Sequence, residues 1–298
     1  MVRVRKKTLK GKTYYYLEHS TRVGGQVQKK ELYLGTKIPS NIEKMKKEFL
    51  DEIYHQKWFV DIEKIRQSYL KNQRLMPKSI RDKEIETFAI NFTYDTQRIE
   101  GSTLTRKETV DLLERGIAPN NKPMIDVQEA EAHKELFFEI IKSKKDLSLH
   151  EILEWHWKLF NRTKGEMAGK IRKYQVAIRG SKFMPPLPVE IHPMLTEFFQ
   201  WYNRNKNKTH PVELAAIAHL KFVTIHPFGD GNGRISRLIM NFILSKKKYP
   251  MLDISYEGRN SYYNALERSN TKDNQRIFLQ WFVKRYINEH KRYLGHHG

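Results

Sequence analysis

The chain has 298 residues, with 55 Lys and Arg, 34 Asp and Glu, 12 His and no Cys. A hydrophobic fraction of 39% is enough for a folded core and excludes a disordered chain. The lack of Cys excludes a disulfide scaffold, a thiolate nucleophile and a Cys-ligated metal. The formal charge of +21 indicates either a polyanionic partner or a lysine-rich solubilising surface. Without an apolar run of membrane-spanning length or a signal peptide, we expect a cytoplasmic protein with no membrane contact.

The N-terminal residues 1–38 are predicted to form a small, basic β-hairpin unit. Strand-forming residues flank a Gly24-Gly25 turn. Ten Lys or Arg against two Glu give this unit about +8 of the total charge. A basic hairpin that carries tyrosines could contact nucleic acid. The alternative is a small solvated sheet that packs on the rest of the chain or on a partner.

A helical linker is predicted over residues 39–84. Ser40 and Glu43 have the spacing of a capping box, and apolar residues continue beyond them at helical spacing. The pattern indicates a helix of 20 or more residues, and Pro77 marks a break before the main domain.

The main domain, residues 85–290, is predicted to be mainly helical because apolar residues recur at helical spacing along most of it. His156 lies on an apolar helix face and is predicted to be a core histidine. The exception to the helical pattern is residues 174–188. There the alternation of Val176 and Ile178, a Gly-Ser turn and a double proline predict a short exposed hairpin.

The strongest chemical signal is the segment His226-Pro-Phe-Gly-Asp-Gly-Asn-Gly-Arg-Ile-Ser-Arg237, between two helical stretches. It lacks the Lys of a P-loop, the preceding strand of a dinucleotide fold and the ligand spacing of an EF-hand. Gly231-Asn232-Gly233 opens a helix, so its backbone N–H groups and helix dipole form an anion cradle. Arg234 and Arg237, three residues apart, add two guanidinium groups suited to phosphates.

Two further side chains give this segment catalytic potential. Asp230 could hold Mg²⁺, which typically takes one or two carboxylates together with substrate phosphates. His226 lies four residues earlier on the same loop and can act as a base beside a bound phosphate.

The segment resembles the signature of the Fic family, whose members transfer nucleotide monophosphates, usually AMP, to protein hydroxyls. The resemblance covers roughly residues 85–285. It implies a Fic-type helical bundle in which residues 174–188 form a β-hairpin flap, preceded by the small β unit and the helical linker. Thr96-Gln-Arg-Ile-Glu100-Gly matches the family's inhibitory helix, here on the N-terminal side of the core.

The resemblance implies a protein adenylyltransferase that moves AMP from ATP to a Tyr, Thr or Ser hydroxyl of an unidentified target protein, with Mg²⁺ as cofactor. Glu100 would inhibit it by competing with the γ-phosphate for Arg237. Val176 and Ile178 on the flap would dock the target. The other implied roles are His226 as base, Asp230 as metal ligand, Gly231, Asn232, Gly233, Arg234 and Arg237 at the phosphates, and Tyr262, Tyr263 and Asn270 at the adenine.

Other functions stay open at this point. A chain with both Glu100 and His226 could also remove AMP from its target. A nucleic-acid-binding regulator that works through the basic hairpin is a second alternative, less favoured because the catalytic segment is complete. The sequence leaves open a homodimer, the identity of the target and the use of another nucleotide donor.

Overall fold

The computed structural model describes residues 2–23 and 26–295. The chain forms two compact units, Met1–Ile65 and Arg66–Gly298, and each is described by itself. Helix α1 (Ile42–Leu75) contains the division between them. Within the described residues, no helix combines the length and apolarity that crossing a membrane requires.

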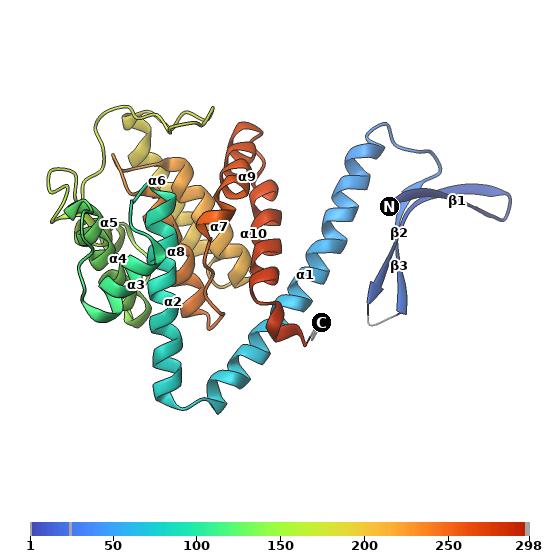
Figure 1. The fold of residues 1–298 in the computed structure, drawn as a ribbon. Coiled ribbons are helices and arrows are strands. Elements are labelled where there is room, and N and C mark those ends of the chain that lie inside the picture. Colours follow the sequence, from blue (N-terminus) through green and yellow to red (C-terminus); the bar gives the residue numbers. More distant parts are fainter. Residues whose placement is uncertain (1, 24–25, 296–298) are drawn as a thin grey trace. The chain divides into compact units, whose positions relative to one another are not determined.

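The first unit contains a three-stranded antiparallel sheet in the order β1-β2-β3 (Figure 1). Its strands are β1 (Arg3–Leu9), β2 (Lys12–Val23) and β3 (Gln26–Gly35). The predicted β unit is confirmed, but it has three strands where a hairpin was predicted. Lys10 and Gly11 take positive φ values of 49° and 74° and reverse the chain between β1 and β2. The predicted turn at Gly24-Gly25 lies outside the described residues.

One face of this sheet packs on the first half of α1. Leu17 of β2 is fully buried and clusters with Phe49 and Ile53 of the helix. Smaller contributions come from the partly buried residues Val2, Val4, Leu34, Ile42 and Met45. Because side chains alternate along a strand, the other face of the sheet points away from this cluster.

The second unit is a helical bundle, which confirms the predicted mainly helical fold (Figure 1). Helix α8 is buried along most of its length and packs against α2, α4, α5 and α7. The elements after α1 are α2 (Lys78–Ile99), α3 (Arg106–Arg115), α4 (Met124–Lys142), α5 (Leu149–Phe160), α6 (Pro188–Asn205), α7 (Pro211–Ile225), α8 (Asn232–Lys246), the short 3-10 helix η1 (Tyr256–Gly258), α9 (Arg259–Thr271), α10 (Gln275–Glu289) and the 3-10 helix η2 (Lys291–Leu294).

Helix α2 begins directly after Pro77, where a break was predicted, and runs without interruption across residues 84 and 85. The division into a hairpin unit over 1–38, a linker over 39–84 and a domain over 85–290 therefore stays a prediction. Gly101, with a φ of 103°, takes the chain away from the helix axis just after Glu100.

The hairpin predicted at residues 174–188 is instead an extended loop without a strand. Pro185 and Pro186 have no backbone N–H group, so a β-ladder would lack donors there. The chain reverses at Gly180, where φ is 76°. The arms are joined through a side chain, because Gln175 Nε2 donates to the carbonyl oxygen of Pro185 at 2.9 Å.

Two carboxyl groups meet where α2 packs on the segment before α9. Burial and the neighbouring Asp95 raise the pKa of Asp253 well above its ordinary value. Asp95 also accepts hydrogen bonds from the backbone N–H of Tyr256 at 2.7 Å and from Arg106 Nη2 at 3.2 Å. The side-chain hydrogen bond between Asp253 and Asp95 therefore connects α2 to the segment before α9.

The buried Asp253 should make the fold less stable as pH rises. Its pKa is higher in the folded than in the unfolded chain, so stability falls above the unfolded value of about 4, at up to about 1.4 kcal/mol per pH unit. Asp253→Asn removes this titration while keeping a donor for Asp95. We expect urea unfolding of this variant to depend less on pH between 5 and 8 than unfolding of the wild type. Asp82→Asn, at an exposed position of α2, is the control. Equal pH slopes for wild type and Asp253→Asn would contradict the assignment.

Candidate active site

The loop that the sequence singled out connects α7 to α8. Helix α7 ends at Ile225 and is capped by His226, whose left-handed backbone has a φ of 50°, and Gly231 caps α8 with a φ of 83°. These two turns present the first N–H groups of α8, which have no partner within the helix, at one point. The predicted anion cradle is therefore the N-terminal turn of α8.

Two glycines of this turn are needed because other groups approach it closely. A Cβ atom on Gly231 would lie 2.3 Å from Cε2 of Phe160. A Cβ atom on Gly233 would lie 2.2 Å from Oε1 of Glu100. The carboxylate of Glu100 therefore lies directly against the first turn of α8, where an anion would bind.

The loop is held in shape by two side chains that hydrogen-bond to its backbone. Asn232 accepts from the N–H of Phe228 and donates to its carbonyl, both at 2.9 Å. The ring of His156 stacks on Phe228, with centroids 3.8 Å apart. The predicted contact of the Asn232 side chain with a phosphate stays a prediction, because this side chain already serves the loop.

His156 is buried, as predicted, and also has a positioning role. Its Nδ1 accepts from the backbone N–H of Gly169 at 2.9 Å, so Nε2 carries the proton and donates to the carbonyl oxygen of Asp230 at 3.0 Å. Burial lowers the pKa of His156 to about 4, which keeps this neutral tautomer in place at pH 7.

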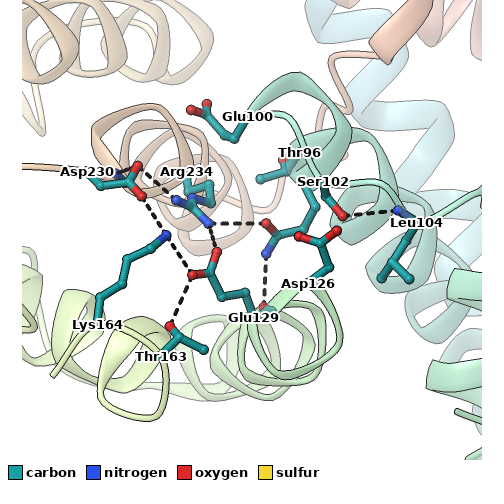
Figure 2. Close-up of polar contacts among 12 residues, drawn as sticks. Thr96, Glu100, Ser102, Leu104, Asp126, Glu129, Thr163, Lys164, Asp230 and Arg234 are labelled. Atoms are coloured by element: carbon teal, nitrogen blue, oxygen red, sulfur yellow. Dashed lines mark hydrogen bonds and ion pairs between the residues drawn. The ribbon is translucent and has the colours of Figure 1, made fainter. Parts of the chain in front are cut away.

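An ion-pair network lies beneath the loop (Figure 2). Arg234 is buried and bonds to Glu129, to Oδ1 of Asp230 at 3.0 Å and to Gln97 at 3.2 Å. Nζ of Lys164 lies 2.7 Å from Oε1 of Glu129 and 2.7 Å from Oδ2 of Asp230. Two cations and two anions thus alternate in one cluster. Arg234 points into this network, and its predicted contact with phosphate stays a prediction.

Sequence reasoning missed Glu129 and Lys164. Glu129 lies on α4 and Lys164 in the turn after α5, and neither belongs to the motif. The only signal that the sequence offered for Glu129 was an acidic residue on an apolar helix face. For Lys164 the sequence offers none, since it is one lysine in a chain with 55 Lys and Arg.

The carboxylate of Asp230 has the properties of a magnesium ligand. Although burial opposes ionisation, Arg234 and Lys164 hold the pKa of Asp230 well below its usual range. Its side chain is 37% exposed. A permanently ionised, accessible carboxylate beside an anion cradle fits a hard cation that also binds phosphate oxygens.

The ring of His226 is oriented by one hydrogen bond to the backbone. Its Nδ1 lies 3.1 Å from the carbonyl oxygen of Val223, so Nδ1 donates and Nε2 is the acceptor. Burial lowers the pKa of His226, even though the bond to Val223 opposes this, and the ring is therefore neutral at pH 7.

The buried Arg172 joins this loop to residues 174–188. Its guanidinium donates to the carbonyl oxygens of His226 at 2.9 Å, Tyr174 at 2.8 Å and Pro186 at 2.6 Å. The predicted flap residues Val176 and Ile178 are half-buried on the segment that Arg172 holds.

The predicted contact between Glu100 and Arg237 is present. Nη2 of Arg237 lies 2.5 Å from Oε1 of Glu100. Nε of Arg237 donates to the hydroxyl of Thr96 at 3.2 Å, one turn earlier on α2. Arg237 is only 1% exposed, so the end of α2 covers it from solvent.

The three residues proposed for adenine have different surroundings. Tyr262 is buried, with its hydroxyl 3.0 Å from Nε2 of His219. Tyr263 is 45% exposed and donates to the carbonyl oxygen of Ile99 at 2.9 Å. Asn270 lies two turns further along α9 and accepts from Thr224 at 2.8 Å. The structure thus brings the loop, Glu100 and Arg237 together, while Asn270 lies apart from the two tyrosines.

The buried network should be essential for stability. Removing one partner of a buried ion pair typically costs about 3–5 kcal/mol, because the other charges are left unpaired. We expect Glu129→Ala to lower the free energy of unfolding by that amount in a urea titration. The control is Glu139→Ala on the same helix, whose exposed pair with Lys158 should contribute less than about 1 kcal/mol. Equal losses in the two variants would contradict a structural role for the network.

Comparison with known proteins identifies relatives of this arrangement. Residues 146–244 match the family model described as the Fic/DOC family. The chain is 36% identical over 185 residues to a protein adenylyltransferase Fic from Drosophila yakuba, covering 60% of this chain and 37% of that protein. It is 33% identical over 216 residues to protein adenylyltransferase fic-1 from Caenorhabditis briggsae, covering 70% of this chain and 42% of that protein. The chain therefore spans about two fifths of the length of these curated relatives.

Solved structures show the same fold. One is a Fic domain containing signaling protein from Bacteroides thetaiotaomicron, with a TM-score of 0.71 and 26% identity, covering 78% of this chain and 95% of that one. Another is Fic-1 from Caenorhabditis elegans, with a TM-score of 0.72 and 28% identity, covering 86% of this chain and 76% of that one.

Proposed function

We propose that this chain, which belongs to the Fic/DOC family, transfers AMP from ATP to a hydroxyl group of a target protein. The observation that carries the proposal is the pairing, on one loop, of the neutral base His226 with the anion cradle of α8. The relatives named protein adenylyltransferase support the same reaction.

Binding of the nucleotide would use the N-terminal turn of α8. The backbone N–H groups of residues 231–233 face the α- and β-phosphates, and Arg237 pairs with the γ-phosphate once Glu100 has withdrawn. Arg234 keeps Asp230 ionised from below. A Mg²⁺ ion held by Asp230 would neutralise phosphate charge when bound. Tyr263 and Asn270 are the accessible candidates for contacts with the adenine.

In the transfer step, Nε2 of His226 takes the proton of the target hydroxyl as its oxygen attacks the α-phosphorus. The bond from the α-phosphorus to the bridging oxygen breaks, and pyrophosphate leaves. Such a base contributes typically 10²–10⁴-fold to the rate. The extended backbone at Val176 and Ile178 offers hydrogen-bonding groups to a target segment, and Arg172 sets its position relative to His226.

Glu100 would keep this reaction slow. Its carboxylate occupies the space above Gly233 and bonds to Arg237, the two places that the phosphates need. A nucleotide bound beside it would have a displaced α-phosphorus. A misplacement of about 1 Å can cost on the order of 10²-fold in rate.

Glu100→Gly should therefore raise AMP transfer on the order of 10²-fold. The measurement is incorporation of labelled AMP into the protein itself at matched concentrations, with circular dichroism to confirm folding. Glu100→Gln keeps the size of the side chain and removes its charge, so its AMP incorporation should lie between that of the wild type and that of Glu100→Gly. If folded Glu100→Gly incorporates as much AMP as the wild type or less, the proposal that Glu100 is inhibitory is wrong.

His226→Ala, made in the Glu100→Gly background, should lower self-modification by roughly 10²–10⁴-fold. Because His226 acts on the acceptor hydroxyl, the affinity for ATP measured by calorimetry should change little. His192→Ala, at an exposed position of α6, is the control. Unchanged self-modification in His226→Ala would remove His226 from the role of base.

A second function, removal of AMP, is favoured by the position of Glu100. Its carboxylate lies at the cradle near the loop that carries His226, and there it could orient a water molecule toward a bound AMP group. The test adds wild-type protein and Mg²⁺ to the AMP-modified Glu100→Gly variant and follows its intact mass. Loss of the AMP mass with wild type, but not with Glu100→Ala, would favour hydrolysis over transfer.

A further inference from the structure

The open face of the N-terminal sheet carries a cluster of three tyrosines. Leu17 points toward α1, so its neighbour Tyr16 points to the opposite face. Tyr16 lies directly across from Tyr33 of β3, with ring centroids 5.2 Å apart. Tyr14 follows on the same face, 6.2 Å from Tyr33. We call Tyr14, Tyr16 and Tyr33 the tyrosine platform.

This platform is accessible and contributes nothing to the core of its unit. Tyr33 is 52% exposed and Tyr14 and Tyr16 are half-buried, whereas Leu17 on the other face is fully buried. A shallow hollow over the platform is lined by Leu9, Lys10, Lys12 and the three tyrosines. Exposed aromatic rings that gather on one sheet face, away from the core, indicate a binding surface.

Positive charge borders the platform. Nζ of Lys7 lies 4.5 Å from the ring centroid of Tyr16. Residues 1–38 contain only two acidic residues, Glu18 and Glu31, and these pair with Arg5 and Lys7 at 2.5 Å each. The acids are therefore neutralised within the sheet, and Lys10 and Lys12 add uncompensated charge at the edge of the hollow.

We propose that the tyrosine platform, with Lys10 and Lys12 at its edge, binds single-stranded nucleic acid. Unpaired bases stack on aromatic rings whatever the nucleotide sequence, and lysines beside the rings contact the phosphates. An acidic peptide would use the lysines but has no groups that require three aromatic rings. A duplex keeps its bases stacked inside and would leave the rings unused. This site is independent of the proposed AMP transfer.

The test measures the affinity of the full chain for a labelled oligothymidylate of about twelve nucleotides by fluorescence anisotropy, over a range of salt concentrations. Tyr33→Ala should weaken binding roughly 10-fold or more, because it removes one stacking surface. Lys12→Ala should reduce the slope of log affinity against log salt by about 0.7, the value for one phosphate contact on a single strand. Lys47→Ala, at an exposed position of α1, is the matched control for lost charge and should change neither quantity.

Three outcomes would overturn the proposal. They are no binding at low salt, affinity that is unchanged in Tyr33→Ala, and displacement of the oligonucleotide by polyglutamate at equal charge concentration. The proposal would also be wrong if a duplex bound more tightly than the single strand and with an affinity unchanged in Tyr33→Ala, because the sheet would then contact phosphates alone. Self-modification of the Glu100→Gly variant should be unaffected by Tyr33→Ala, so a failure here is distinct from a failure of the transferase proposal.

Discussion

The N-terminal turn of α8 needs a negative charge, and the rest of the site depends on how that need is met. The N–H groups of this turn, the helix dipole and the buried guanidinium of Arg237 all face one place. A buried cation left without a partner is strongly destabilising. Glu100 supplies the charge from the end of α2. The carboxylate that satisfies the fold therefore stands where the substrate's phosphates would bind.

The two arginines of the motif have different roles because the carboxylates that they pair with differ in burial. Arg234 pairs with Glu129, whose side chain is 7% exposed and is also held by Lys164. Arg237 pairs with Glu100, whose side chain is 25% exposed and lies at a helix end. Displacing Glu129 would strand charges in the interior, whereas displacing Glu100 returns one carboxylate to water. The pair of Arg234 with Glu129 is a fixed support, and under the proposed function only the pair of Arg237 with Glu100 would be exchanged for a phosphate.

The sequence was sufficient for the parts of the site that are local in the chain. The loop from 226 to 237 and the pattern at Glu100 are contiguous, so the cradle and the end of α2 could be predicted together with the helical fold. Glu129 and Lys164 could not, because only tertiary packing brings α4 and the turn after α5 beneath the loop. The hairpin at 174–188 failed for another reason. Alternating apolar residues favour a strand, but Pro185 and Pro186 have no N–H groups to donate to a β-ladder. The N-terminal unit has three strands instead of the two of the predicted hairpin, because the chain also turns at Lys10 and Gly11.

Arg172 connects the loop that carries His226, the proposed base, to the segment proposed to hold the target. Its three carbonyl acceptors belong to His226, Tyr174 and Pro186, so one buried side chain fixes both the catalytic loop and the extended loop beside it. Under the proposed function, backbone groups rather than a side-chain pocket would place the acceptor, so the reacting hydroxyl would be selected by its position along an extended segment. Such a docking mode would leave the target's sequence without a matching side-chain pocket in this chain, which is why the sequence does not identify the target.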